Sequence, residues 1–372
     1  MKVALLLQFY FPFGGLQRDC VAMAQGLAER GMQVTIVTRS WEGEQPMGIE
    51  VIELGARGVS NVAMDQNFDR DVRAWLATKD FSAVVGFSRL ETDMDFYYAA
   101  DPCYRLRIER DRSIWYQFTR KCRYFKSLEK KLFGMGGHTQ LLLITEMEVP
   151  DYQAFYGTEL ERITILPPSI RKRDLTMKGK EALRKEVRKR MHWPDELPVV
   201  LFVGSGFATK GLDRAISACA AIQSDLKFCV VGDGKTGEYK TQVKRVAAED
   251  CIDFLGGRDD AWELMAGADL MIHPARSENT GTVLVEALSA GTGVLTTDRC
   301  GFSNHISASG AGRVLSSPFD QNALNETLEN LLAEPWQERA ESALQYAAEE
   351  DLYSGMQTAV SKVMSLATQC AS

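Results

Sequence analysis

The sequence predicts an α/β protein composed of two doubly wound domains, each built on a parallel sheet with helices on both faces. Short continuous runs of valine, isoleucine and leucine alternate with helical segments, which is typical of buried parallel strands. The alternation occurs twice, and a length of 372 residues exceeds what one hydrophobic core usually holds. Pro167 and Pro168 separate the two series, because neither a helix nor a central strand continues through adjacent prolines.

The first series begins with a short apolar run at the N-terminus. We interpret this run as a strand and not a signal peptide, because it lacks a cleavage site and is too short to span a bilayer. An amphipathic helix is expected over 17–30, and Gly31 ends it. The predicted strands of this half are Val3–Phe9, Val34–Thr38, Glu50–Leu54, Ala83–Phe87 and Leu141–Thr145.

The second series predicts five more strands and a helical C-terminal part over 322–366. The expected organisation is a first domain over 1–167, a second over 168–350 and a last helical segment over 351–372. The predicted strands of this half are Val199–Val203, Phe228–Val231, Ile252–Leu255, Leu270–His273 and Val294–Thr297.

Composition narrows the function. The net charge is −7, so bulk electrostatics do not favour nucleic-acid binding. The eight cysteines are scattered and form no C-x-x-C pair, which argues against a zinc site or a disulfide framework and indicates a reducing cytoplasm. The natural ligand site of a protein with two such sheets is the cleft outside the carboxyl ends of the strands.

Two glutamates eight positions apart, Glu278 and Glu286, mark the most informative segment. Glu278 is expected in the loop after a buried strand and Glu286 one to two turns into the next helix. The backbone N–H groups between them would open that helix, and a helix N-terminus attracts anions. A phosphate cradle with a carboxylate on each side suits a sugar nucleotide; the alternative is two ordinary surface glutamates. The cradle consists of Asn279, Thr280, Gly281 and Thr282.

Two glycine loops follow other predicted strands. Gly14 and Gly15 let the backbone approach a ligand before a helix, although a tight turn alone would also explain them. Lys210 follows Ser205 and Gly206 in the second loop and could meet a phosphate, unless it is a solvated surface lysine. The first loop lacks the G-x-G-x-x-G fingerprint, which disfavours NAD binding there, and the second loop lacks the residue order of a P-loop.

The segment 105–131 is strongly basic and aromatic. It carries ten basic and three acidic residues, a local net charge of 10 − 3 = +7. Basic side chains with interleaved aromatics predict a peripheral membrane surface. A solvated helix with its aromatics in the core is the alternative, and an RNA-binding patch is disfavoured because no RNA-binding module accompanies it. The residues expected at the membrane are Arg105, Arg107, Arg110, Arg112, Trp115, Arg120, Lys121, Arg123 and Lys126.

These elements together resemble the GT-B retaining glycosyltransferases of family 4. They occur in family order over nearly the whole chain: the Gly14-Gly15 loop, Lys210-Gly211, Gly232-Asp233-Gly234, Phe254-Leu255-Gly256, His273-Pro274 and the pair Glu278/Glu286. The first loop, the segment 96–101 and the segment 351–354 are similar to the glucosyltransferases that add the first glucose to heptose of the lipopolysaccharide inner core. The resemblance implies two Rossmann-like domains facing across a cleft. It also implies that the last helix, residues 353–366, crosses back to pack on the first domain.

The resemblance also implies roles for single residues. Glu286 would hold the ribose hydroxyls of UDP, and Glu278 the hydroxyls of the donor hexose. The N–H groups around Thr280, Gly281 and Thr282 would hold the diphosphate, with Lys210 neutralising the leaving UDP. Gly15 would let the diphosphate approach the first domain, and Arg258 would lie near uracil.

The chain departs from the family pattern at two positions. Many members carry an arginine where this chain has Ser205, so the leaving-group charge would depend more on Lys210 and the helix dipole. Many also carry a histidine near the donor sugar; Asp101 is our candidate in its place, with a simple helix or loop cap as the alternative. Asp19 is a second candidate on the acceptor side.

Metal dependence is not expected. Asp69-Arg70-Asp71 and Asp93-Met94-Asp95 match a D-x-D pattern, but such triplets arise easily among 50 acidic residues. GT-B enzymes hold the diphosphate with a helix and basic side chains, so the UDP-sugar would be a co-substrate without a metal or other cofactor. His273 ends a strand beside the proposed site, and we expect a satisfied, partly buried histidine there.

The sequence therefore predicts a retaining hexosyltransferase that moves glucose from UDP-glucose to a heptose of the lipopolysaccharide inner core. It would act in the cytoplasm, bound peripherally to the anionic inner membrane, without nucleic-acid partners; the oligomeric state stays open. Another UDP-hexose, another lipid-linked acceptor or a UDP-sugar 2-epimerase are alternatives within enzymes. If the protein is not an enzyme, the alternative is a non-catalytic scaffold that binds sugar nucleotides at the membrane. This alternative stays open because Ser205 replaces the arginine that many family members carry.

Overall fold

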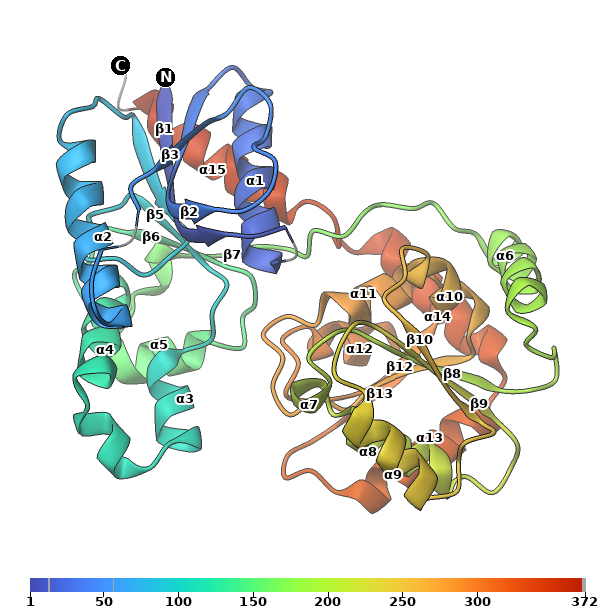
Figure 1. Cartoon of the computed structure of the whole chain (residues 1–372). Coiled ribbons are helices and arrows are strands. Elements are labelled where there is room, and N and C mark those ends of the chain that lie inside the picture. The colour runs from blue at the N-terminus through green and yellow to red at the C-terminus, as the bar shows by residue number, and fades with distance from the viewer. Residues whose placement is uncertain (13, 56, 370–372) are drawn as a thin grey trace. The chain divides into compact units, whose positions relative to one another are not determined.

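The computed structural model describes residues 1–12, 14–55 and 57–369. Phe13 of the first glycine loop and residues 370–372 of the predicted last helix lie outside this description. The chain divides into two compact units (Figure 1). Unit 1 contains Met1–Ser169 and the segment from Ser354 onward, and unit 2 contains Ile170–Tyr353. The expected boundaries after 167 and 350 lie close to these positions.

Unit 1 is built on a parallel sheet, which has seven strands among the described residues, in the order β3-β2-β1-β4-β5-β6-β7. The strands are β1 (Lys2–Tyr10), β2 (Gln33–Trp41), β3 (Glu50–Glu53), β4 (Ala83–Gly86), β5 (Phe96–Ala99), β6 (Gln140–Leu143) and β7 (Ile163–Ile165). The helices are α1 (Gly15–Ala28), α2 (Asn61–Leu76), α3 (Tyr104–Asp111), α4 (Arg120–Phe133), α5 (Val149–Tyr156) and α15 (Gly355–Gln369), with 3-10 turns η1 (Ile114–Phe118) and η2 (Leu160–Arg162).

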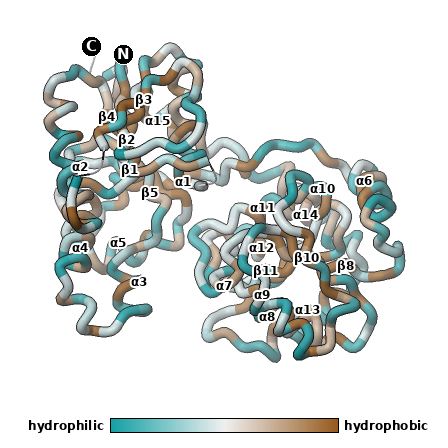
Figure 2. The backbone as a smooth tube through the Cα atoms, viewed as in Figure 1, coloured by the Kyte–Doolittle hydropathy of each residue, from teal (hydrophilic) through white to brown (hydrophobic). Residues whose placement is uncertain are grey.

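The central strand β1 shows why helices cover both faces of this sheet. Val3, Leu5 and Leu7 pack in one cluster with residues of α1 and α15, whereas Leu6 packs in another with residues of α2 and α5. Side chains alternate along a strand, so an uninterrupted apolar run must be buried on both sides. Figure 2 shows the hydrophobic colour along the strands of this sheet. The returning helix α15 packs against α1.

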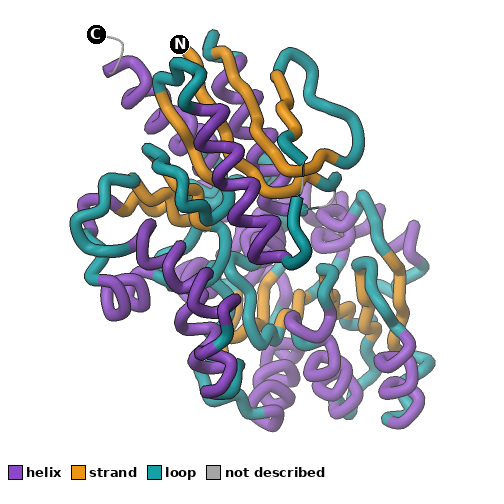
Figure 3. Tube along the Cα trace, turned by 60° about the vertical axis from the view of Figure 1, so that its left-hand side comes forward, coloured by secondary structure: helices purple, strands orange, loops and turns teal. Residues whose placement is uncertain are grey.

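Unit 2 repeats the plan with a parallel sheet of six described strands in the order β10-β9-β8-β11-β12-β13. Its strands are β8 (Val199–Val203), β9 (Lys227–Val231), β10 (Ile252–Gly256), β11 (Leu270–His273), β12 (Gly293–Thr297) and β13 (Gly312–Leu315). Its helices are α6 (Met177–Met191), α7 (Phe207–Lys210), α8 (Leu212–Ala221), α9 (Gly237–Arg245), α10 (Ala261–Gly267), α11 (Thr282–Ser289), α12 (Ser303–Ser309), α13 (Gln321–Ala333) and α14 (Trp336–Glu349). Figure 3 shows helices flanking the strands in each unit.

The predicted fold class, two doubly wound parallel-sheet domains, is confirmed. All ten predicted strands are present, with ends that differ by a few residues. The prediction missed β5, β7 and β13, which have only three or four residues each and lack a long aliphatic run. In both sheets the strand order reverses direction beside the first strand, between β1 and β4 and between β8 and β11. Ligands of doubly wound sheets bind at such switch points.

A buried ion-pair cluster fastens α6 to the sheet of unit 2. The Asp269 carboxylate accepts hydrogen bonds from Arg184 at 2.6 Å, from Arg188 at 2.5 Å and from the Val199 amide at 2.7 Å. At most a tenth of each of these three side chains is exposed. The carboxylate thus joins helix α6 to the start of β8.

We expect Asp269→Asn to destabilise unit 2 by about 3–5 kcal/mol, because removing one partner leaves two arginines buried without their countercharge. Urea unfolding of the full chain, followed by circular dichroism, measures the change. Asp225→Asn, at an exposed position, is the control and should change stability by less than about 0.5 kcal/mol. Equal stability of both variants would mean that the cluster does not hold α6.

Candidate active site

The switch point of unit 2 brings two loops together. One follows β8 and leads through α7, and the other follows β11 and leads into α11. The amides of Arg276 and Ser277 donate to the Thr209 carbonyl at 2.7 and 3.4 Å. Gly211 has a φ of +75°, and a Cβ there would lie 2.1 Å from the Pro274 carbonyl oxygen, so only glycine permits this approach of the loops.

Lys210 and Glu278 form an ion pair where these loops meet. The Lys210 ammonium donates to Glu278 Oε2, and both side chains are about one-fifth exposed. The backbone fixes Glu278, because its N–H donates to the Arg299 carbonyl at 2.9 Å and its carbonyl accepts from Gly301 at 3.1 Å. Lys210 in turn lies against Gly204, where a Cβ would come within 2.9 Å of its Cδ.

Helix α11 begins directly after this pair. Gly281 is its N-cap, with a φ of +73°, and Thr282 is its first residue. A left-handed N-cap favours glycine and supplies no capping side chain to the first amides of the helix. The Leu284 amide of the first turn is already used, since it donates to the Gly281 carbonyl at 2.8 Å. Glu286 is half-buried on the same helix, as the spacing predicted, and Asn279 and Thr280 lie in the loop before it. A diphosphate would find backbone donors here and a lysine beside them.

The structure contradicts the prediction for His273, which was expected to be partly buried and satisfied. His273 is completely buried, and neither ring nitrogen has a hydrogen-bond partner within the described part of the chain. Its Nε2 lies 3.9 Å from Glu278 Oε2, and its ring stacks on Phe202 at 5.8 Å between centroids. Burial, together with the nearby charge of Lys210, lowers the pKa of His273 to about 3. The imidazole is therefore neutral beside the ion pair.

Ser205 and Arg258 were also predicted to lie at the donor site. Ser205 is exposed in the loop after β8 and brings no charge to it. Arg258 is bound bidentately to Asp260, at 2.7 and 2.8 Å, so its guanidinium is already occupied. This pairing holds the pKa of Asp260 below its usual value. A contact of Arg258 with a base would have to use its remaining donors or its planar face.

In unit 1 the glycine loop after β1 is tightly built. A Cβ at Gly14 would lie 1.8 Å from Gln17 Oε1, whereas Gly15, the first residue of α1, has open space. Asp19 lies further along α1 and accepts a hydrogen bond from the Tyr98 hydroxyl at 3.1 Å. Burial raises the pKa of Asp19, opposed by Arg18 and this hydrogen bond.

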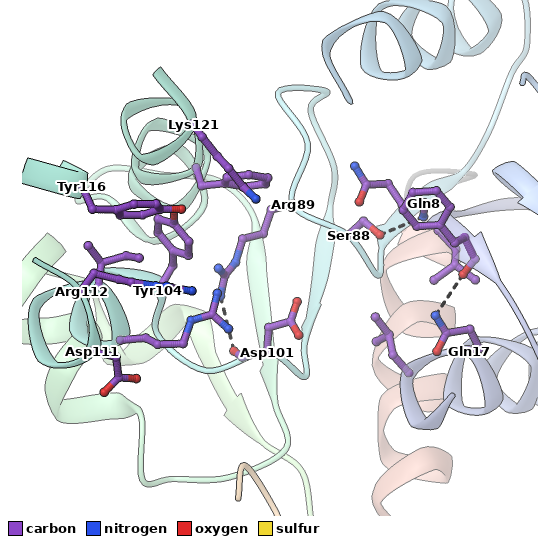
Figure 4. A pocket seen from close by; sticks show the side chains of 16 residues that line it. Gln8, Gln17, Ser88, Arg89, Asp101, Tyr104, Asp111, Arg112, Tyr116 and Lys121 are labelled. Atoms are coloured by element: carbon purple, nitrogen blue, oxygen red, sulfur yellow. Dashed lines mark hydrogen bonds between the residues drawn. The ribbon is translucent and has the colours of Figure 1, made fainter. Parts of the chain in front are cut away.

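A cavity of about 530 Å³ lies at the switch point of unit 1. Figure 4 shows Gln8, Gln17 and Ser88 on one side of it and the residues from α3 to α4 on the other, with Arg89 and Asp101 between. Asp101, a predicted catalytic candidate, lines this cavity with an exposed side chain, whereas Asp19 is not among the lining residues. The full lining is Leu7, Gln8, Phe9, Leu16, Gln17, Ser88, Arg89, Asp101, Tyr104, Arg107, Ile108, Asp111, Arg112, Tyr116, Lys121 and Phe125.

Glu129, which the sequence reading did not single out, holds the wall of this cavity in place. Its carboxylate is completely buried and pairs with Arg89 at 3.2 Å. It also accepts from the amides of Tyr104 and Arg105 at 2.7 and 2.9 Å, at the N-terminus of α3. A carboxylate in that position favours both the unpaired amides and the helix dipole. No sequence signal distinguished Glu129 from the charged surface of α4.

The basic segment divides into two faces. Ile114, Trp115 and Phe118 of η1 are 66%, 78% and 68% exposed, an unusual concentration of apolar surface. Tyr124 is buried and Phe125 half-buried, so part of the aromatic content belongs to the core, as the alternative interpretation had it. Within the described residues, no helix is long and apolar enough to cross a membrane.

The residues expected at the membrane fall into three groups: some line the cavity, some form ion pairs or hydrogen bonds, and some are exposed. Arg107, Arg112 and Lys121 line the cavity, while Arg105 pairs with Glu109 at 3.0 Å and Arg110 with Asp111 at 2.7 Å. Trp115, Arg120 and Arg123 are exposed, and Lys126 donates to Gln117 at 3.0 Å.

The D-x-D carboxylates serve structural contacts. Asp69 accepts from the amide and hydroxyl of Thr92 at 2.8 Å, and Asp95 accepts from the Val84 amide at 2.8 Å. Asp93 pairs with Lys131 at 2.7 Å. Across the described residues, no three His, Cys, Asp or Glu side chains gather as a metal site would require.

The burial of His273 predicts a pH dependence of stability. Its pKa is about 3 when folded and ordinarily about 6.5, so protons bind the unfolded chain preferentially. The neutral imidazole should contribute fully above pH 6.5, and its contribution should fall as the pH drops from 6.5 towards 3. Between pH 7 and 5, the free energy of unfolding should fall by about 2 kcal/mol more in wild type than in His273→Asn. His138→Asn, at an exposed histidine, should keep the wild-type slope; the same slope in all three proteins would contradict the assignment.

The chain is similar to known proteins over almost its whole length. Residues 184–350 match the family described as Glycosyl transferases group 1. The lipopolysaccharide glucosyltransferase WaaG of Escherichia coli K12 is 36% identical over 363 residues, which cover 95% of this chain and 96% of that protein. A crystal structure of WaaG superimposes with a TM-score of 0.86 and 35% identity, over 97% of this chain and 99% of that one.

More distant structures share the fold. Sucrose-phosphate synthase from Thermosynechococcus elongatus has a TM-score of 0.75 at 16% identity, over 99% of this chain and 98% of that one. Two parallel-sheet domains, with two loops that meet at a switch point, agree with these similarities. The chain belongs to the Glycosyl transferases group 1 family, with the GT-B fold, and is a hexosyltransferase of that family.

Proposed function

We propose that this enzyme transfers glucose from UDP-glucose to a heptose of the lipopolysaccharide inner core, with retention of the anomeric configuration. The observation that carries the proposal is the Lys210–Glu278 ion pair beside the N-terminus of α11, in a chain 36% identical to a lipopolysaccharide glucosyltransferase. The cavity of unit 1, with Asp101 on its wall, is the proposed acceptor site.

The donor would use unit 2. The diphosphate would accept hydrogen bonds from the amides of Thr280, Gly281 and Thr282, and Lys210 would turn from Glu278 to the phosphate. Glu278 would then be released to bind hydroxyls of the hexose. Glu286 would bind the ribose hydroxyls from the first turns of α11.

Catalysis would depend on stabilising the departing UDP. As the glycosidic bond breaks, the anomeric carbon becomes oxocarbenium-like and negative charge grows on the diphosphate. Fixed amides and one lysine stabilise that charge without reorganising. A leaving phosphate oxygen on the front face would accept the proton of the attacking acceptor hydroxyl, which requires the acceptor to be aligned. Double displacement would instead need a carboxylate beneath the anomeric carbon.

We propose that no metal ion takes part, because Lys210 and the α11 amides supply positive charge where the diphosphate would lie. We also propose that the protein works in the cytoplasm at the inner membrane. The exposed side chains of Ile114, Trp115 and Phe118 would enter the lipid interface, and the neighbouring Arg120 and Arg123 would attract anionic headgroups.

The first test is UDP release from a panel of UDP-sugars, in EDTA, with purified lipopolysaccharide truncated at heptose. We expect acceptor-dependent release with UDP-glucose. Glu278→Gln and Lys210→Gln should each reduce kcat on the order of 100-fold or more, because each removes a fixed charge from the reacting groups. Glu263→Gln, a carboxylate paired with Arg173 and with none of the proposed donor residues, is the control and should keep wild-type kcat.

Each rival function gives a different result. Release only with another UDP-sugar, or only with another lipid-linked acceptor, would replace the proposed substrates. UDP binding without release from any donor would favour the scaffold. Activity that disappears in EDTA and returns with manganese would contradict the metal-free proposal.

Membrane association has its own test. Sedimentation with vesicles containing phosphatidylglycerol should capture the full chain at low salt. Arg120→Gln combined with Arg123→Gln should weaken binding on the order of tenfold, since each basic residue near an anionic leaflet contributes about 1 kcal/mol. Trp115→Ala should weaken binding at high salt as well, because its contribution is apolar. Equal binding of neutral and anionic vesicles would contradict the proposal that Arg120 and Arg123 attract anionic headgroups.

A further inference from the structure

The cavity of unit 1 carries an excess of unpaired positive charge. Its lining contains four cations, Arg89, Arg107, Arg112 and Lys121, and two carboxylates, Asp101 and Asp111. Asp111 is bound by Arg110 at 2.7 and 3.1 Å, which lowers its pKa and occupies its charge. Arg89 is likewise occupied, by Glu129 at 3.2 Å.

The remaining three cations have no partner in direct contact in the described part of the chain. Asp111 is the carboxylate near Arg107 and Arg112, and Asp65 is the one near Lys121. Arg110 and Arg39 already bind these two carboxylates. Within the described residues, the side chains of Arg107, Arg112 and Lys121 make no hydrogen bond and no ion pair closer than 4 Å. Arg107 lies 5.5 Å from the ring centroid of Tyr104, and Arg112 lies 5.4 Å from that of Tyr116. Stacking on a ring orients a guanidinium and leaves its edge donors open to an anion.

The rest of the lining suits a sugar. Gln8, Gln17 and Ser88 offer amide and hydroxyl groups, and Asp101 offers an acceptor for hydroxyl donors. The floor is fixed, because the buried Arg89 donates to the carbonyls of Asp101 and Pro102 at 3.4 and 2.8 Å. A neutral sugar would leave the three cations without a counterion.

We propose that the cavity binds an acidic acceptor glycan, with Arg107, Arg112 and Lys121 binding a carboxylate or phosphate group and Asp101 the sugar hydroxyls. The acceptor role of the glycan rests on the proposed function. The presence of a site for an acidic glycan does not depend on that function. Three of the nine residues that sequence reasoning gave to the membrane thus recognise the substrate. They determine which acceptors are used, while the exposed tip of η1 and Arg120 and Arg123 serve the lipid surface.

Binding of lipid-free oligosaccharide to the full chain separates these two roles. The probe is the core oligosaccharide released from heptose-terminated lipopolysaccharide, in intact, phosphatase-treated and carboxyl-reduced forms, with affinity measured by calorimetry. We expect the intact glycan to bind, and removal of the recognised acid to weaken binding on the order of tenfold or more, since hydrogen bonds to charged groups contribute about 1.5–3 kcal/mol. The form that loses affinity identifies the group as phosphate or carboxylate.

The variants locate the contact. Arg107→Gln, Arg112→Gln and Lys121→Gln should each weaken binding of the acidic glycan about tenfold, with little further effect on the form without the acid. They should also raise the acceptor KM. Lys130→Gln removes one charge from the same segment outside the cavity and is the matched control.

Three results would overturn the proposal. These are no binding of the intact glycan, equal binding of all three forms, or variants that lose affinity equally for acidic and neutral forms. Calorimetry does not depend on turnover, so a protein that binds the acidic glycan without transferring glucose would refute the proposed function and leave this site standing.

Discussion

The arrangement of the two loops at the candidate site of unit 2 depends on the ion pair between Lys210 and Glu278. Because β8 and β11 are neighbours in a parallel sheet, the loops that follow them must leave the same edge. Gly211 allows these loops to touch, and the pair neutralises two charges that would otherwise stand alone in a half-buried position. A diphosphate would replace Glu278 as the partner of Lys210. The neutral His273 beneath them supplies a polar group without adding a competing charge.

A second carboxylate organises unit 1 in a comparable way. Glu129 is buried between Arg89 and the first amides of α3, so the helix that carries Arg107 is fixed against the floor that carries Asp101. Burying such a charge is costly unless each oxygen is satisfied, and the Tyr156 hydroxyl adds a further hydrogen bond at 2.7 Å. The segment from α3 to α4 thus supplies both a wall of the cavity and the exposed apolar side chains of η1.

Sequence reasoning succeeded where a local pattern determines the structure. Long aliphatic runs located the main strands, and the spacing of Glu278 and Glu286 located a loop and a helix. It failed where tertiary packing decides, because His273 is buried against Phe202 of another strand and its pKa is lowered further by Lys210 of another loop. The sequence predicted the charge of the basic segment but not which of its residues line the cavity and which are exposed. The break at Arg112 and Ser113, between α3 and η1, sets the side-chain directions. Glu129 gave no signal, since charged residues surround it in the sequence.

A crystal structure of the full chain with UDP-glucose bound would show whether these residues hold the donor. We expect the diphosphate on the amides of Thr280 to Thr282, Lys210 on a phosphate oxygen, and Glu278 on hydroxyls of the hexose. A nucleotide bound elsewhere, with the Lys210–Glu278 pair intact, would contradict the account and return these residues to a structural role.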